Sequence, residues 1–241
     1  MRNLALVFAV TLALCLVAGC GGGQPPPSAP APAPETVAPP PAPTPEPTAE
    51  PTPTPSPVEP EAPALKTPDN LQAAYAGETD AMARYKAFAE AADKEKYKAV
   101  AMLFRAAVRA EEIHAKKIAD VITAAGGTPV AGIATPEVKK TAENVKAALA
   151  GESAERDTVY PGFVETAKAE GRADAESLFK GMMEVEGEHA KLYKKADKDL
   201  AYWKKADREF WLCPVCGNVM TSRKESCGIC GTDPGAFEEI K

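Results

Sequence analysis

Two stretches of four residues decide the fold of this chain: Glu111-Glu112-Ile113-His114 and Glu186-Gly187-Glu188-His189. They contain the two histidines of the sequence, and each lies within a long segment that has the apolar periodicity of an amphipathic helix. Because side chains at positions i and i+3 lie on one face of a helix, each stretch presents a carboxylate and an imidazole to the same point. Two such helices predict a site that binds two metal ions.

The two stretches belong to an internal duplication with an offset of roughly 75 residues. Asn70–Glu78 recurs as Asn144–Glu152, and both copies end in Ala-Gly-Glu. A repeated helical hairpin would place two equivalent ligand sets around a pseudo-twofold axis. Glu155 has no acidic counterpart, because it corresponds to Ala81. The equivalent ligands are Glu78 and Glu152, Glu111 and Glu186, and His114 and His189.

The N-terminal residues have the composition of an export signal. Met1–Asn3 contain one arginine, Leu4–Val17 are apolar but too short to span a bilayer comfortably, and small residues lead directly into Cys20. We interpret residues 1–19 as a lipoprotein signal peptide, whose end resembles the bacterial lipobox, and Cys20 as the lipidated mature N-terminus. An ordinary cleaved signal or a short anchor is the alternative.

Residues 20–66 are predicted to form a disordered tether. Residues 25–63 hold 18 of the 24 prolines and almost no large apolar side chain. In an extended polyproline II conformation this segment could reach on the order of 100 Å from a membrane. A proline ligand for a recognition domain is the alternative, but the prolines follow no consistent spacing. We expect an exported protein, lipid-anchored to the cell membrane or outer membrane and facing the periplasm or cell exterior.

Four helices are expected in residues 67–206, as a bundle with one long crossover. Thr67 is expected to cap the first helix, and Gly126-Gly127 to end the second. Thr135-Pro136 is expected to start the third helix after a loop of about nine residues, and Pro161 to kink that helix. Its apolar stripe is expected to comprise Val138, Val145, Leu149, Val159 and Phe163, with Glu152 among them.

The carboxylates on or beside the apolar stripes require a compensating charge. A single glutamate on a solvated helix face needs no explanation, but ionised carboxylates inside a bundle would cost roughly several kcal/mol each. Bound divalent cations supply that charge. Oxygen-rich ligation with two imidazoles suits iron or manganese, and it does not exclude zinc.

The C-terminal residues 207–241 contain two C-x-x-C-G loops, Cys213–Gly217 and Cys227–Gly231. Four thiolates at this spacing predict a tetrahedral metal site. The pattern alone suits structural zinc or iron. The dinuclear site favours iron, because a redox-active metal pair needs a one-electron donor close by. The four ligands would be Cys213, Cys216, Cys227 and Cys230.

The order of these motifs resembles that of the rubrerythrin family. The resemblance covers about residues 68–241 and includes Glu155, Tyr160-Pro161, and Trp211 two residues before the first cysteine of the module. It implies a ferritin-like four-helix bundle followed by a rubredoxin-like module. It also implies a non-haem di-iron peroxidase, which reduces hydrogen peroxide to water with electrons from the sulfur-bound iron.

The resemblance further implies a role for each ligand of the bundle. Glu111 and Glu186 would bridge the two irons, whereas Glu78 and Glu152 would bind one iron each. His189 would bind the iron that Glu152 binds.

The second iron would exchange His114 for Glu155 on oxidation, which gives the unduplicated glutamate a role. Tyr75, Tyr85 and Tyr160 match family tyrosines near the centre, although filling of the aromatic core explains them equally well. A homodimer is also expected.

The export signal departs from the family pattern, since rubrerythrins are mostly cytosolic. The pyridine-nucleotide-linked reductases associated with the family could not reach an exported chain, so we expect an unidentified electron donor in the envelope. An iron-binding or redox-sensing module and a ferroxidase that uses dioxygen are the alternative functions. The net charge of −6 and the absence of a basic stripe argue against a nucleic-acid partner.

Overall fold

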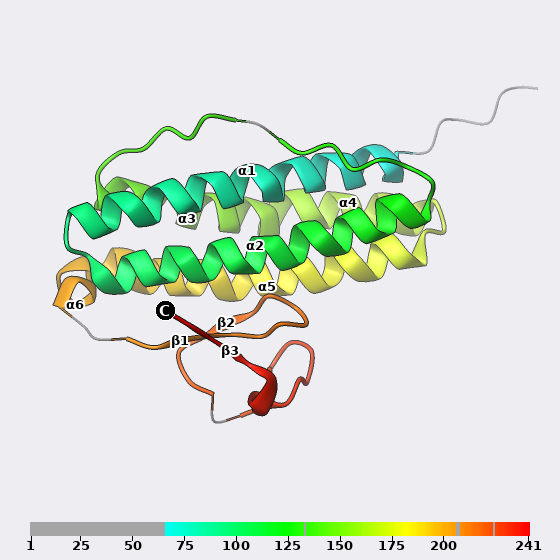
Figure 1. Cartoon of the computed structure of the whole chain (residues 1–241). Helices are drawn as coiled ribbons and strands as arrows, with labels where there is room; N and C mark the ends of the chain where they lie inside the picture. Colours follow the sequence, from blue (N-terminus) through cyan, green and yellow to red (C-terminus); the bar gives the residue numbers. More distant parts are fainter. Residues whose placement is uncertain (1–65, 133, 206–207, 224) are drawn as a thin grey trace, which may run out of the picture. The chain divides into compact units, whose positions relative to one another are not determined.

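A computed structural model describes residues 66–132, 134–205, 208–223 and 225–241. The predicted signal peptide, Cys20 and all of the predicted tether except Lys66 lie outside these residues. Within them, long helices form an antiparallel bundle and three short strands form a small C-terminal module (Figure 1), which confirms the predicted fold class. None of the helices in these ranges has the length and apolar character needed to cross a membrane.

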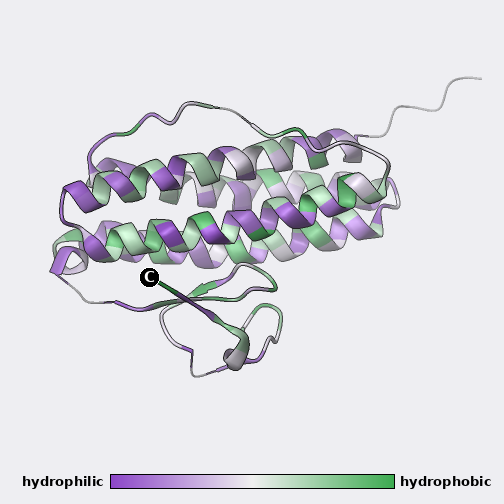
Figure 2. Ribbon diagram, viewed as in Figure 1, coloured by the Kyte–Doolittle hydropathy of each residue, from purple (hydrophilic) through white to green (hydrophobic). Residues whose placement is uncertain are grey.

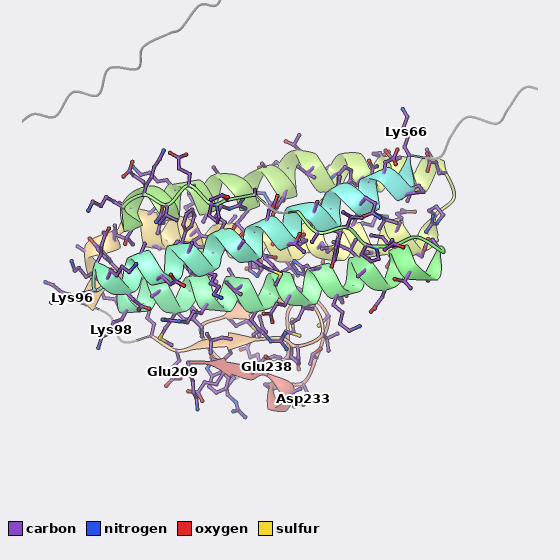
Figure 3. All side chains as sticks on the ribbon, turned by 45° about the horizontal axis from the view of Figure 1, so that its top comes forward. Lys66, Lys96, Lys98, Glu209, Asp233 and Glu238 are labelled. Atoms are coloured by element: carbon purple, nitrogen blue, oxygen red, sulfur yellow. The ribbon has the colours of Figure 1, made fainter. Side chains whose placement is uncertain are left out.

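The bundle pairs α1 with α2, and α3 and α4 with α5 (Figure 1). Hydrophobic and hydrophilic residues are mixed along each helix (Figure 2), as expected for amphipathic helices, and the buried apolar residues form the clusters inside the bundle. Lys96 and Lys98 mark the tight turn between the first two helices (Figure 3). The helical elements are α1 (Thr67–Lys94), α2 (Lys98–Ala124), α3 (Thr141–Ala154), the π-helical segment η1 (Glu155–Val159), α4 (Tyr160–Ala169), α5 (Ala173–Lys198) and α6 (Leu200–Lys205).

Two apolar clusters fill the bundle, and the predicted metal ligands lie between them. Along α1, Glu78 comes between Ala74 of one cluster and Ala81 of the other. Along α2, His114 comes between Ile113 of one cluster and Ile118 of the other. The carboxylates and imidazoles therefore occupy a polar layer with packed side chains on either side, which fixes their rotamers and excludes water.

The first helix begins differently from the prediction. Thr67 is its first helical residue, Lys66 occupies the N-cap position, and no side chain of either residue caps the helix. Instead the Glu170 carboxylate accepts the backbone N–H of Lys66 at 2.7 Å and that of Thr67 at 2.9 Å. The predicted Thr67 cap is wrong, because a carboxylate from the end of α4 satisfies the unpaired N–H groups of the first turn.

The crossover between α2 and α3 is longer than predicted, because α3 begins at Thr141 and not at Thr135-Pro136. The crossover runs along α1 (Figure 1), where the side chains of Thr79 and Asp80 accept its backbone N–H groups and the Gln72 amide both donates to it and accepts from it. Gly132 fits this close approach, since a Cβ atom there would lie 2.5 Å from the carbonyl oxygen of Ala76. The last of these contacts holds Ala134, directly before the predicted start, and residues 135–140 are not helical. Val138 is consequently exposed and not part of a helical stripe.

The third helix is interrupted before Pro161, by η1. Pro161 itself lies in the first turn of α4, where its missing N–H needs no partner. The predicted kink is therefore a π-helical turn, which places one additional residue in the helix. The extra residue rotates the helix beyond it, so that Val159 is exposed and Tyr160 is buried.

The C-terminal module is a three-stranded antiparallel sheet in the order β2-β1-β3, formed by β1 (Phe210–Leu212), β2 (Val219–Met220) and β3 (Glu238–Ile240), with a short 3-10 helix η2 (Pro234–Ala236). Each C-x-x-C-G loop closes in the same way. Gly217 donates its N–H to the Cys213 carbonyl, and Gly231 donates its N–H to the Cys227 carbonyl. Both glycines have positive φ angles of 86° and 74°, which L side chains rarely adopt.

Candidate metal centres

The bundle brings six of the predicted ligands into two overlapping clusters, in which the ligand atoms all lie within 4.8 Å of one another. Each of the six residues is 2% exposed or less. Glu111 and Glu186 belong to both clusters, which is the arrangement expected of carboxylates shared by two metal ions. The first cluster comprises Glu78, Glu111, His114 and Glu186, and the second comprises Glu111, Glu152, Glu186 and His189.

Both imidazoles turn their Nδ1 atoms toward the carboxylates. Nδ1 of His114 lies 3.0 Å from Oε2 of Glu111 and 2.9 Å from Oε1 of Glu186. Nδ1 of His189 lies 2.9 Å from Oε2 of Glu186 and 3.5 Å from Oε2 of Glu152. Each Glu-x-x-His stretch therefore presents its carboxylate and its imidazole to one point, as the sequence predicts.

The opposite nitrogens of the two rings face the C-terminal module. Nε2 of His114 lies 3.0 Å from the carbonyl oxygen of Cys216, and Nε2 of His189 lies 3.1 Å from that of Gly217. A carbonyl oxygen only accepts hydrogen bonds, so each Nε2 carries the proton. The Nδ1 atoms are then the ring nitrogens that face the carboxylate cluster and that would bind a metal once deprotonated, which is how a metal-binding histidine is oriented by an outer hydrogen bond.

The ionisation of the cluster is strongly perturbed. Burial, together with the Glu111 carboxylate, raises the pKa of Glu78 well above its ordinary value, and burial raises the pKa of Glu152 to about 7. Burial also acts to raise the pKa of Glu186, but His114 and His189 together lower it below the ordinary value. The buried carboxylates thus compete for positive charge, and two imidazoles alone do not satisfy all of them.

Several buried ligand atoms have no hydrogen-bond partner among the described residues. His114 Nδ1 and Glu186 Oε1 are two of them, because their 2.9 Å approach lacks the angles of a hydrogen bond. Leaving a buried polar atom unpaired costs about 1–3 kcal/mol. Carboxylate oxygens and an imidazole nitrogen that converge without hydrogen-bonding to one another are suitable ligand atoms for a pair of divalent cations. The other unpaired ligand atoms are Oε2 of Glu78, Oε2 of Glu111 and Oε2 of Glu152.

Two of the three predicted tyrosines contact the cluster, and they do so symmetrically. Tyr85 donates its hydroxyl to Oε1 of Glu152 at 2.6 Å, and Tyr160 donates its hydroxyl to Oε1 of Glu78. Tyr75 lies at the edge of the apolar cluster near Tyr160, and within the described residues its hydroxyl forms no hydrogen bond with a cluster carboxylate. The first two tyrosines fix the outer carboxylates, whereas Tyr75 fills space.

Glu155 lies next to the clusters but in neither of them. It is the first residue of η1, is half-buried, and has its pKa raised by burial and by the carboxylates of Glu78 and Glu152. The offset between the repeats changes here, from 74 positions for Glu78 and Glu152 to 75 positions for Tyr85 and Tyr160. One inserted residue therefore accompanies the π turn that carries Glu155, and the asymmetry of the site is a feature of the backbone.

The four cysteines of the module converge as predicted. The Sγ atoms of Cys213 and Cys230 are 3.5 Å apart, as are those of Cys216 and Cys227. A tetrahedron with metal–sulfur bonds of about 2.3 Å has edges of roughly 3.8 Å, so the four thiols fit one metal ion. Cys213, Cys216 and Cys227 are buried, whereas Cys230 is exposed.

The surroundings of the thiols differ between the two faces of the module. Burial acts to raise the pKa of Cys230, but the Thr232 hydroxyl at 3.0 Å and other hydrogen bonds lower it to about 6. The Cys216 carbonyl, in contrast, faces His114 in the bundle. One side of the four-sulfur site is therefore open to a partner, and the other side contacts the carboxylate–histidine cluster.

The first C-x-x-C-G loop packs tightly on the bundle. A Cβ atom at Gly217 would lie 2.8 Å from Nε2 of His114, whereas one at Gly231 would meet nothing within 4 Å. A second attachment is the forked pair in which Arg109 donates from Nε and Nη2 to Glu238, each at 3.0 Å. Figure 3 labels Glu238 on the last strand of the module.

Replacing Gly217 by alanine is expected to disturb the contact between the module and the bundle. Gly231→Ala is the matched control, because both glycines have positive φ and their replacement costs about 1–2 kcal/mol of backbone strain in either loop. Both variants should lose similar stability in the module, but Gly217→Ala alone should slow electron transfer from the sulfur-bound iron to the bundle. Stopped-flow absorbance of the module iron checks this. Equal electron-transfer rates in the two variants would contradict a role of this contact in electron transfer.

Sequence patterns do not reveal two features of this site. The first feature is that the rings of His114 and His189 both contact backbone carbonyls of the module. Every residue has a backbone carbonyl, so a sequence pattern does not predict these contacts. The π turn at Glu155 has a signal in the change of the repeat offset. That signal identifies the insertion only after Tyr85 is matched with Tyr160.

Comparison with known proteins agrees with this architecture. A family profile described as Rubrerythrin matches residues 69–197. A rubrerythrin of Porphyromonas gingivalis is 34% identical over 181 residues, which are 73% of this chain and 90% of the relative. A nigerythrin of Nitratidesulfovibrio vulgaris is 36% identical over 166 residues, 68% of this chain and 81% of the relative.

Solved structures show the same likeness. A nigerythrin structure, described as partially reduced, superposes with a TM-score of 0.68 at 31% identity and covers 77% of this chain and 91% of that one. A bacterioferritin from Desulfovibrio desulfuricans superposes with a TM-score of 0.54 at 21% identity, a likeness of fold alone.

A ferritin-like bundle with a carboxylate–histidine cluster, continued by a rubredoxin-like four-cysteine module, defines a class of non-haem iron proteins. Within that class the chain belongs to the rubrerythrin family, whose members are di-iron proteins of the oxidative-stress response. Its cofactors are the two of this family, a di-iron site in the bundle and one iron in the four-cysteine site.

Proposed function

We propose that this protein is a peroxidase that reduces hydrogen peroxide to water, with electrons relayed from the four-cysteine site to the di-iron site. The observation that carries the proposal is the direct contact between the two sites, through the hydrogen bonds from His114 to Cys216 and from His189 to Gly217. A protein that only stores iron would not need a one-electron redox site that is hydrogen-bonded to the metal ligands of its bundle. When bound, an iron pair at this site would supply the two electrons that, with two protons, convert hydrogen peroxide into two water molecules, and an iron held by the four thiolates would be a one-electron donor.

The ligand assignment follows the two clusters. Glu111 and Glu186 would bridge the two irons, because they belong to both clusters. Glu78 and His114 would complete one iron, and Glu152 and His189 would complete the other. The four thiolates of Cys213, Cys216, Cys227 and Cys230 would hold the module iron.

Residues of the chain supply the fixed and the movable parts of the di-iron site. Tyr85 and Tyr160 hold the outer carboxylates by hydrogen bonds, so Glu152 and Glu78 keep their places. Glu155 is the movable ligand, since it lies outside the clusters beside carboxylates that raise its pKa. It would replace His114 when the centre is oxidised, because an anionic ligand favours the ferric state over the ferrous state.

The proposal is tested by comparing the rates at which peroxide and dioxygen re-oxidise the reduced, iron-loaded protein. Faster re-oxidation by peroxide, with water as the product, supports a peroxidase. Faster re-oxidation by dioxygen would support a ferroxidase. Re-oxidation that is slow with both would leave metal binding or redox sensing as the function.

We further propose that the protein works at the cell envelope, held there by lipid on Cys20. The sequence of the leader and the proline-rich residues that follow it support this placement. An envelope electron donor would then deliver electrons at the exposed Cys230 side of the module. The expected homodimer stays a prediction.

Replacing Cys20 by alanine is expected to block lipidation and release the protein from the membrane fraction. Cys230→Ala is the control, since it removes a cysteine without touching the leader. Detergent extraction of fractionated cells, followed by mass measurement of the N-terminus, checks the result. A Cys20→Ala protein that stays membrane-bound and carries as much lipid as the parent would overturn the lipobox interpretation.

A further inference from the structure

Asn218 is a buried polar residue directly after the first C-x-x-C-G loop, and it is 5% exposed. Its side-chain Nδ2 donates a hydrogen bond to the Sγ atom of Cys227 at 3.6 Å. Cys227 belongs to the second loop, so this amide connects the two halves of the four-sulfur site. Asn218 therefore contacts one of the sulfur ligands without being a ligand itself.

Backbone contacts hold Asn218 in this position. Its carbonyl accepts the N–H of Cys213 at 2.9 Å. The carbonyl of Gly217, the preceding residue, faces His189 of the bundle, and β2, which lies against the bundle (Figure 1), begins at the next residue. The amide is thus attached to ordered backbone between the sulfur site and the histidines.

The other end of the Asn218 side chain is unfavourably placed. Within the described part of the chain, its buried Oδ1 has no hydrogen-bond partner. An unpaired buried acceptor lowers stability, and leucine has nearly the same shape without any polar atom. Asparagine is therefore not the residue that stability alone would favour at this position. Its hydrogen bond to Cys227 indicates a different task.

The second loop has a corresponding contact at the surface. Thr232 follows this loop as Asn218 follows the first, and its carbonyl likewise accepts the N–H of a cysteine, that of Cys227 at 2.9 Å. The Thr232 hydroxyl lies 3.0 Å from the Sγ atom of Cys230. Cys230 is exposed, so water can take the place of that hydroxyl. Cys227 is 3% exposed, so water has little access to the contact with Asn218.

A hydrogen bond to a sulfur ligand favours the reduced form of a four-thiolate iron site. Reduction adds one electron and no proton, so it leaves one further negative charge on the site. An N–H dipole directed at a sulfur atom stabilises this charge, and buried surroundings strengthen the interaction. Hydrogen bonds to the sulfurs and solvent exposure are accordingly among the factors that set the reduction potential of such sites.

We propose that Asn218 is a positioning residue that stabilises the ferrous state of the module iron through Cys227 and thereby raises its reduction potential. The value of this to the protein rests on the proposed relay of electrons to the bundle. A higher potential allows a donor of modest reducing power to reduce the module iron. It also allows the module to keep its electron until the bundle irons have been oxidised.

Asn218→Leu is expected to lower the reduction potential of the module iron, because the leucine side chain has no N–H group to stabilise the ferrous state. We expect a shift of about tenfold in the ferric–ferrous equilibrium, which is about 59 mV for a one-electron step. Asn218→Ala should lower the potential in the same direction, and it tests the proposal if leucine does not fit. Redox titration of the full chain, followed by the visible absorbance of the ferric site, measures the potential.

Thr232→Val is the matched control, because it also removes a side-chain contact to a sulfur atom. Water can replace this hydroxyl, so its potential should stay within about twofold of the parent equilibrium, well short of the effect of a lost buried hydrogen bond. An unchanged potential in both Asn218 variants, or an equal shift in Thr232→Val, would overturn the proposal. The titration needs no peroxide, so its result can be read even if the parent protein has no peroxidase activity.

Discussion

Glu155→Ala is expected to leave both irons bound and to lower peroxide turnover by about 10–100-fold, the range typical of perturbing the groups around a metal site. The six clustered ligands remain in this variant, which is why the metals stay. The oxidised centre loses one anionic ligand while the reduced centre loses none, so the di-iron reduction potential should rise. Metal analysis, steady-state peroxide consumption and a redox titration check the three parts.

Glu143→Ala is the matched control for this variant. Glu143 is an exposed glutamate in the first turn of α3, so its removal should change neither turnover nor potential. If Glu155 were another solvated helix residue, its alanine variant would behave like the control. Unchanged kinetics and potential in a fully metallated Glu155→Ala protein would leave the symmetric six-ligand site as the whole of the chemistry.

Cys213→Ser is expected to abolish peroxide turnover that depends on an electron donor. Cys213 is a fully buried member of the four-thiol set, so the module loses its iron while the bundle, which shares no ligand with it, keeps both metals. The parent protein should be red, because four thiolates around ferric iron give strong visible charge-transfer bands, and the variant should lack this colour. Absorbance spectra and metal analysis of anaerobically purified protein check both statements.

The Cys213→Ser variant also distinguishes electron transfer from the module from the reaction of the bundle irons with peroxide. When the bundle irons of Cys213→Ser are reduced directly by a chemical reductant, they should still react with peroxide in a single turnover. A colourless parent protein with zinc filling the module, or donor-driven turnover that survives in the variant, would remove the electron relay from the account.

The repeated motifs predict most of the site because helix periodicity fixes directions. Glu111 and His114, or Glu186 and His189, can face one point only if each segment is helical, and the apolar residues around them decide which face is buried. The spacing of the cysteines works in the same way, since a C-x-x-C-G loop has one compact closure. Both constraints act between residues that are close in the sequence, so they can be predicted from the sequence alone.

The parts that sequence reasoning placed wrongly depend on long-range contacts. Thr67 resembles a helix cap, but the Glu170 carboxylate from another helix performs that task. Thr135 resembles a helix start, but hydrogen bonds to α1 hold the crossover up to Ala134, and the helix begins only at Thr141. In both cases a distant partner outweighs a local preference of about 1 kcal/mol.

The π turn lies between these two cases. Pro161 indicates a break in the helix, and a break is present, but its form follows from one inserted residue and not from the proline. The inserted turn gives the site a glutamate outside the clusters on one side only. The sequence repeat shows that Glu155 has no acidic counterpart. Only the structure shows that Glu155 lies outside the metal clusters.

The most direct test of the account is to mix fully reduced, iron-loaded protein with hydrogen peroxide, without dioxygen, and to follow the module iron by its visible absorbance. The account predicts that the ferric colour of the four-cysteine site returns as peroxide is consumed, because electrons leave this site through the contacts of Cys216 with His114 and Gly217 with His189. It also predicts that no dioxygen is released. A module iron that stays reduced while peroxide disappears, or peroxide that is not consumed, would contradict it.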